Sequence, residues 1–71
     1  MTKYWPNAVA LNALDQPTRL FTYSAVNSIA ECDEIFVKWA TKYPYRLLIT
    51  WVDAVYDCGS KKMIHKKEYV N

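Results

Sequence analysis

The feature that most constrains the fold is an apolar stripe within residues 28–43. Six apolar side chains recur there at offsets of 0, 3, 4, 7, 8 and 11 residues: Cys32, Ile35, Phe36, Trp39, Ala40 and Tyr43. Residues three and four positions apart lie on the same side of an α-helix, because the helix has about 3.6 residues per turn. The spacing therefore predicts one amphipathic helix that packs against the rest of the chain along this stripe.

The residues at both ends of the stripe also favour a helix. Ser28 lies three residues before Glu31, which is the spacing of a capping box, where a hydroxyl and a carboxylate each accept a hydrogen bond from an otherwise unpaired backbone N–H. Acidic residues gather in the first turns and lysines in the last, which suits the helix dipole, and Pro44 cannot continue the helix. We therefore attribute these charges to helix electrostatics rather than to a binding site.

Two strands joined by a turn are predicted before the helix. Residues 7–14 alternate as strand residues do, residues 19–26 form a second β-rich stretch, and Asp15, Gln16 and Pro17 are typical of a turn. The pairing expected across this turn brings bulky side chains together on one face: Leu11 with Phe21, and Val9 with Tyr23. Small side chains then share the opposite face: Ala8, Ala10, Thr22 and Ser24.

Two further strands are predicted after the helix, at residues 45–56 and 61–70, with a turn around Gly59. Symmetric pairing about this turn aligns one set of residues: Leu48 with Tyr69, Val52 with His65, Ala54 with Met63, and Tyr56 with Lys61. On the reverse face it aligns Leu47 with Val70, Ile49 with Glu68, and Trp51 with Lys66. A slip of one residue would exchange the two faces, because successive strand residues point to opposite sides.

The predicted elements define an α+β fold in the order β-β-α-β-β. We expect an antiparallel four-stranded sheet with one helix packed on one face, forming a single small domain over residues 1–71. One helix cannot cover both faces of such a sheet. The second face would carry an apolar group of side chains: Leu47, Ile49, Trp51, Val55, Ile64 and Val70.

An apolar patch of this kind has two explanations. Monomeric proteins rarely leave large contiguous apolar patches in water, so a second copy of the chain is one expected cover. Alternatively, the sheet twists strongly, or the segment around Tyr4 and Trp5 folds back over it. We favour the homodimer, because a domain of 71 residues buries only about 60% of its unfolded surface and gains stability from a second apolar layer.

Catalytic and cofactor chemistry finds little support in the sequence. Gly59 is the only glycine, which excludes the Gly-rich loops of dinucleotide and P-loop sites. Cys32, Cys58 and His65 lack the paired spacing of a structural zinc site, although they remain potential ligands if the fold brings them together. His65 is the only histidine and has no nucleophile motif beside it. We therefore predict no enzyme, no catalytic residue, no cofactor and no metal.

The cysteine count and the apolar runs bear on location. Two cysteines are too few for a secreted disulfide framework, and no signal-peptide pattern is evident, so the expected location is cytoplasmic. The longest apolar run, residues 47–51, is far shorter than the roughly 20 residues that span a bilayer, so we expect no membrane insertion.

Two binding functions remain. The leading interpretation is a small binding or regulatory protein that uses an aromatic, lysine-edged sheet surface and self-associates, with contact residues Leu47, Ile49, Trp51 and Lys66. The alternative is a nucleic-acid-binding protein that uses the basic C-terminal hairpin through Arg46, Trp51, Lys62, Lys66 and Lys67.

The net charge of only +2 gives the nucleic-acid alternative weak electrostatic support. Strand alternation places Lys62 and Lys66 on one side of the last strand and Lys61, His65 and Lys67 on the other. Lysines on a terminal strand have a simpler explanation, because they protect a sheet edge against pairing with other strands.

Overall fold

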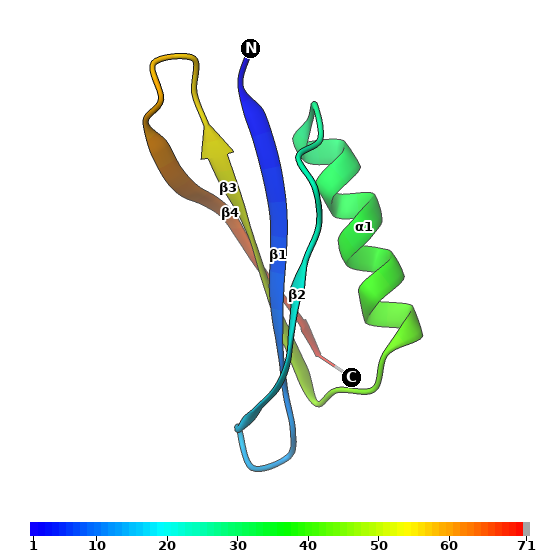
Figure 1. Ribbon diagram of the computed structural model, residues 1–71. Helices are drawn as coiled ribbons and strands as arrows, with labels where there is room; N and C mark the ends of the chain where they lie inside the picture. Colours follow the sequence, from blue (N-terminus) through cyan, green and yellow to red (C-terminus); the bar gives the residue numbers. More distant parts are fainter. Residues whose placement is uncertain (71) are drawn as a thin grey trace.

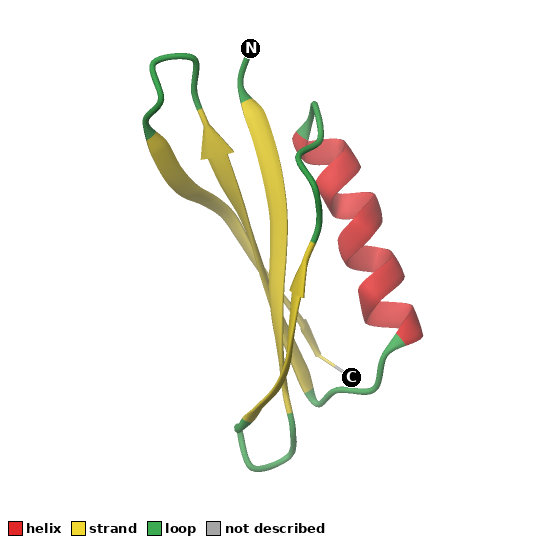
Figure 2. Ribbon diagram, viewed as in Figure 1, coloured by secondary structure: helices red, strands yellow, loops and turns green. Residues whose placement is uncertain are grey.

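The computed structural model describes residues 1–70 and contains one sheet and one helix (Figure 1). The elements in chain order are β1 (Lys3–Leu11), β2 (Pro17–Thr22), α1 (Ile29–Lys42), β3 (Leu47–Val55) and β4 (Lys61–Val70). The four strands are antiparallel to their neighbours and lie in the order β2-β1-β3-β4. The helix runs along one side of the sheet, over β1 and β3 (Figure 2). The predicted α+β fold and its element order are confirmed.

The helix begins and ends as its sequence predicts. The Ser28 hydroxyl accepts a hydrogen bond from the Glu31 N–H at 3.2 Å, and the Glu31 carboxylate accepts one from the Ser28 N–H at 3.0 Å, which completes the capping box. Tyr43 is the C-cap, and Pro44 follows it. Cys32 and Phe36 are fully buried, so the apolar stripe faces the sheet.

Small residues on the sheet allow the helix to approach closely. Ala8 and Ala10 in β1 and Ala54 in β3 are buried, and they leave room for the large helix side chains. The Trp39 ring stacks on Phe21 with ring centroids 5.2 Å apart, and Phe36 lies 5.9 Å from Trp39. Aromatic pairs at these distances add favourable energy beyond the apolar area that they bury.

The first hairpin differs from the prediction in extent and register. The pairs between β1 and β2 are Asn7 with Thr22, Ala8 with Phe21, Val9 with Leu20, Ala10 with Arg19 and Leu11 with Pro17. The predicted alignments of Leu11 with Phe21 and of Val9 with Tyr23 are therefore wrong. Phe21 instead joins Ala8 and Ala10 on the helix side.

The loop between these strands explains the shift in register. Strand β1 ends at Leu11, and the Asn12 side chain accepts hydrogen bonds from the backbone N–H groups of Leu14 and Gln16. Asp15 adopts φ 59°, the left-handed region that Asn and Asp tolerate best. The turn thus begins at Asn12 rather than at Asp15, and β1 extends toward the N-terminus instead.

The N-terminal segment is part of the central strand β1 and does not fold back over the sheet. Tyr4 packs on the helix side against the cluster of Cys32, Phe36 and Val52, whereas Trp5 points to the other face and is 41% exposed. Figure 1 shows this segment running along the sheet as the start of β1. The predicted alternative in which the segment around Tyr4 and Trp5 covers the open face is therefore excluded.

Pro6 fits inside β1 because of a gap in the neighbouring ladder. Tyr4 and Val26 exchange both backbone hydrogen bonds, at 3.0 and 2.8 Å, so even-numbered residues of β1 direct their backbone groups toward β2. Strand β2 ends at Thr22, opposite Asn7. Pro6 therefore lacks an N–H at a position between Thr22 and Val26 where the ladder is interrupted.

Strand β4 contains a β-bulge that divides its register in two. From Leu47 to Thr50 the pairs follow the predicted alignment, including Leu48 with Tyr69 and Ile49 with Glu68. Beyond a shift between Thr50 and Val52, the pairs are Val52 with Ile64, Asp53 with Met63, Ala54 with Lys62 and Val55 with Lys61. The predicted pairs Val52–His65, Ala54–Met63 and Tyr56–Lys61 are wrong, and Trp51 falls at the shift, opposite the bulged residues.

The bulge arises at His65, whose φ of 55° is left-handed. The extra residue reverses the faces on the turn side of the strand. Ile64 packs on the helix side against Cys32, Phe36 and Val52, which corrects its predicted place on the opposite face. Alternation from the register pairs also regroups the lysines, with Lys61 and Lys66 on one face and Lys62 and Lys67 on the helix side.

Within residues 1–70, no helix is long and apolar enough to cross a membrane.

Candidate interaction surface

The face of the sheet opposite α1 is the main candidate site, and we call it the open face. No other helix or strand of residues 1–70 lies over it (Figure 2). Alternation places the odd-numbered residues of β1 and β3 on this face, because the even-numbered ones are buried under the helix. Its apolar members are Trp5, Val9, Leu11, Leu20, Leu47, Ile49, Trp51, Val55, Met63 and Val70.

One end of the open face is continuously aliphatic. Val9 lies between Leu20 of β2 and Ile49 of β3 in the register, and Leu47 lies between Leu11 of β1 and Val70 of β4. Val9, Leu11, Leu47 and Ile49 are half-buried, whereas Leu20 and Val70 at the margins are 66% and 76% exposed. The central side chains are thus flanked by their cross-strand neighbours, and no other helix or strand of residues 1–70 lies above them.

The other end combines two tryptophans with a polar cluster. The register aligns Trp5 with Asp53 and Asn7 with Trp51, so rings and polar groups alternate between β1 and β3. The Asn7 side-chain amide donates to the Asp53 carboxylate at 3.0 Å and to the Trp5 carbonyl at 2.9 Å. Lys61 Nζ lies 3.9 Å from the same carboxylate. The charge of Asp53 is therefore already paired within the chain.

The structure brings the predicted partner-binding residues together. Leu47, Ile49 and Trp51 are alternate residues of β3, half-buried on the open face. Lys66 follows the bulge on the same face, on the neighbouring strand. The predicted apolar group lacked five residues of the open face: Trp5, Val9, Leu11, Leu20 and Met63. Trp5 was readable from the alternation that continues through Pro6, but Leu20 and Met63 required the correct hairpin registers.

The predicted nucleic-acid-binding residues are spread over two faces. Trp51 and Lys66 lie on the open face, whereas Lys62 lies on the helix side, where Lys67 is 3.7 Å from Asp33. Arg46 lies before β3, at the opposite end of the sheet from Lys62, and forms an ion pair with Asp15. These basic groups do not form one patch, and nucleic-acid binding stays a prediction.

His65 connects β4 to the helix. Its Nε2 lies 2.9 Å from the Asp33 carboxylate, which Lys67 also approaches, so one acidic group of α1 contacts both sides of the bulge. Among residues 1–70, no group of three His, Cys, Asp or Glu side chains is arranged to hold a metal ion. The three potential ligands considered from the sequence are thus not brought together as a metal site.

The two thiols have opposite environments. Cys32 is fully buried, and burial together with Asp33 and Glu31 raises its pKa to about 11. Cys58 is exposed in the turn between β3 and β4, and hydrogen bonding with the Ser60 hydroxyl, 2.9 Å from its Sγ, lowers its pKa. Cys32 is therefore a core residue, and Cys58 is the more accessible nucleophile of the two.

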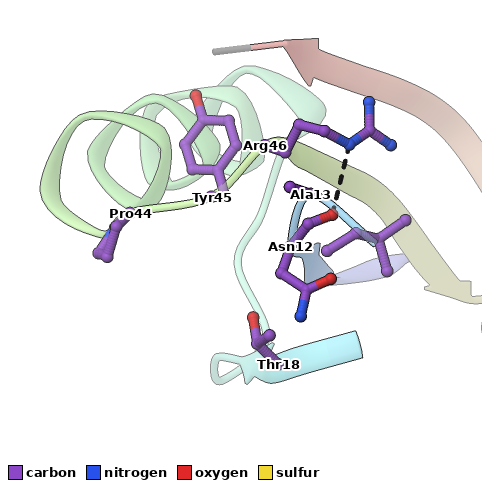
Figure 3. Close-up of a pocket in the computed structure, with 7 residues that line it drawn as sticks. Asn12, Ala13, Thr18, Pro44, Tyr45 and Arg46 are labelled. Atoms are coloured by element: carbon purple, nitrogen blue, oxygen red, sulfur yellow. Dashed lines mark hydrogen bonds between the residues drawn. The ribbon is translucent and has the colours of Figure 1, made fainter. Parts of the chain in front are cut away.

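A hollow of about 530 Å³ lies at the end of the sheet near the β1–β2 loop (Figure 3). Its lining comes from the loop and from the connection between α1 and β3: Leu11, Asn12, Ala13, Thr18, Pro44, Tyr45 and Arg46. Arg46 Nε donates to the Asn12 carbonyl at 3.3 Å, and the Thr18 hydroxyl donates to the Ala10 carbonyl at 3.3 Å. These groups join the two connections to each other and to β1, which is a structural role.

No protein-family model matches the chain, and no curated protein or solved structure matches it either.

Proposed function

We propose that the protein is a non-enzymatic binding protein that self-associates, with its open face packed against the open face of a second copy. The observation that carries this proposal is the open face of β1 and β3, aliphatic at one end and bearing Trp5 and Trp51 at the other, which no other element of residues 1–70 covers. Removing such a surface from water is favourable by about 25 cal/mol per Å² of apolar area.

The dimensions of the face suit a specific interface. The backbone extends 40 × 19 × 16 Å along its principal axes, so one sheet face offers roughly 700 Å², close to the ~800 Å² that each partner of a standard interface buries. Trp5 and Trp51 supply the large aromatic anchors that commonly dominate interface energies.

The charges on the open face favour a second copy as the partner. Besides the Asp53 and Lys61 pair, the acidic Glu68 and the basic Lys66 lie on this face. A two-fold axis places the same surface on both sides of the interface, so acidic groups of one copy can meet lysines of the other. Both cysteines are free thiols, which agrees with the cytoplasmic location that forms part of this proposal.

Sedimentation of wild-type protein and of a matched pair of variants tests the proposal. Ile49→Lys places a charge at the centre of the open face, whereas Val37→Lys places one at an apolar position of the helix that is already 51% exposed. Each two-fold interface contains the substituted residue twice, so Ile49→Lys should weaken association by about a hundredfold or more.

Wild-type protein should assemble at micromolar concentration, and Val37→Lys should assemble like it. Circular dichroism should show that both variants keep the helix and the sheet. A wild-type chain that stays monomeric at several hundred micromolar, or an Ile49→Lys variant that assembles unchanged, would contradict the proposal.

A further inference from the structure

The two edges of the sheet differ in how they resist pairing with other strands. Strand β4 forms one edge and carries Lys61, Lys62, Lys66 and Lys67, with the bulge at His65 between them. Lysines and bulges are the devices by which natural sheets prevent association through their edges. The β4 edge is therefore protected.

The β2 edge has fewer such devices. Strand β2 contains no lysine, and its one charged side chain, Arg19, bends over aromatic rings on the helix side, 5.1 Å from Phe21 and 4.3 Å from Tyr43. Leu20 on the open face is 66% exposed. A regularly paired stretch whose one charge is Arg19 remains at Arg19–Thr22, between the irregularity at Leu11 and the end of the strand.

The backbone of this stretch presents hydrogen-bonding groups outward. Even-numbered residues of β1 direct their N–H and C=O groups toward β2, as the Tyr4–Val26 exchange shows. Ala8 and Ala10 therefore form the hydrogen-bonded pairs with Phe21 and Arg19. The alternate residues, Leu20 and Thr22, direct their N–H and C=O groups away from β1, at the free edge.

We infer that the β2 edge pairs antiparallel with the β2 edge of a second copy, centred on Leu20. In that register the two copies of Leu20 exchange both backbone hydrogen bonds, and Arg19 of each copy lies opposite Phe21 of the other. The arrangement places no like charges opposite each other, and it adds a third ring to the two that Arg19 already contacts.

The helices leave room for this pairing. A two-fold axis perpendicular to the sheet keeps both helices on the same side. The α1 backbone lies closest to β1 and β3, and the side chains of Trp39 and of the C-cap Tyr43 extend to Phe21 of β2. At a strand spacing of about 4.8 Å, the two helix axes would stand roughly 19 Å apart, about twice the distance of packed helices. The joined sheet has a doubled open face, but the inference does not depend on what covers that face.

Two proline variants test the inference. Leu20→Pro removes an outward N–H and an exposed apolar side chain from the β2 edge. Met63→Pro does the same on the β4 edge, because Met63 is 61% exposed on the open face and, by the alternation along β3, also directs its N–H outward. Leu20→Pro should weaken the edge-paired dimer at least tenfold, and Met63→Pro should leave it unchanged.

Each proline substitution is also made separately in the Ile49→Lys variant, which separates edge pairing from the open-face association of the proposed function. Ile49→Lys alone should leave an edge-paired dimer, which Leu20→Pro converts to monomer and Met63→Pro does not. If Ile49→Lys alone is monomeric, the edge inference is overturned and the face proposal stands. If Ile49→Lys assembles unchanged and only Leu20→Pro dissociates the chain, the face proposal fails and the edge inference stands.

Amide hydrogen exchange tests the edge pairing in wild-type protein, without any substitution that could unfold the chain. In wild-type protein the N–H groups of Leu20 and Thr22 should exchange at least tenfold more slowly in the assembled state than in dilute monomer. Stacking of open faces alone leaves these backbone groups at a free edge. Equal exchange rates for Leu20 and Thr22 in both states would overturn the inference.

Discussion

The two faces of the sheet use different residues for different purposes. Under the helix, the two central strands contain small side chains, Ala8, Ala10 and Ala54, besides the buried Leu48 and Val52, and α1 adds Phe36 and Trp39 above them. On the open face the sheet itself supplies bulky side chains, which remain half-exposed. The contrast teaches that residue size along a strand reports which face has a covering layer, because a helix needs space and a bare face must shield itself.

The largest expected difference between the faces is at the centre of the helix layer. Phe36 is fully buried against Cys32 and Val52 and lies 5.9 Å from the Trp39 ring. Phe36→Ala should lower the free energy of unfolding by about 3 to 5 kcal/mol, enough to unfold much of so small a domain. Urea unfolding followed by circular dichroism checks this, and a loss below about 1 kcal/mol would show that the helix layer is not the core.

Two adjacent leucines in β3 allow a matched comparison of the faces. Leu48 is 1% exposed under the helix, and Leu47 is half-buried on the open face. In dilute protein, Leu48→Ala should cost about 2 to 5 kcal/mol and Leu47→Ala clearly less, because less apolar contact is lost.

Association should reverse part of that order. At concentrations where the chain assembles, Leu47→Ala should weaken assembly more than Leu48→Ala does, relative to the stability of each variant. Equal stability losses in dilute protein would mean that the open face is covered in the monomer.

The smallest expected effect is the change in unfolding free energy with pH that comes from Cys32, which is buried under the helix. The pKa of Cys32 rises from 9.0 to about 11, chiefly through burial, so between these values the unfolded chain loses its thiol proton before the folded chain does. The Cys32 contribution to stability should thus be complete below pH 9 and decline as the pH rises toward 11.

Urea unfolding at about pH 8 and about pH 10 measures this decline. Cys32→Ala removes the titrating group and serves as the control, because tyrosines and lysines titrate in the same range. The decline should be steeper in wild-type protein than in Cys32→Ala, and equal slopes would indicate a hydrated thiol.

The sequence predicted the helix well because its signals are local. The capping box at Ser28, the apolar stripe and Pro44 all act within one or two turns, so no knowledge of the sheet was needed. The same holds for β3, where strict alternation identified Leu47, Ile49 and Trp51 as one surface.

The strand registers depended on features with weak sequence signals. The bulge in β4 has a histidine in the left-handed conformation, where glycine, asparagine or aspartate would have been readable, and a contact with Asp33 on another element accompanies it. In the first hairpin, Asn12 reads as a strand residue until its side chain is seen to bind the loop backbone. A register error of three residues in the first hairpin and of one residue in the turn half of the second changed which side chains joined the candidate site.

Pro6 has a consequence for how the sheet avoids wrong alignments. The contacts of β1 with β3 determine that Pro6 turns its nitrogen toward β2. Any sliding of the first hairpin that carries a continuous ladder past this point leaves a carbonyl of the sliding strand without a donor. Pro6, which donates no backbone hydrogen bond, therefore disfavours misaligned pairings of the first hairpin. In the native structure it loses no hydrogen bond, because the ladder is already interrupted at this position.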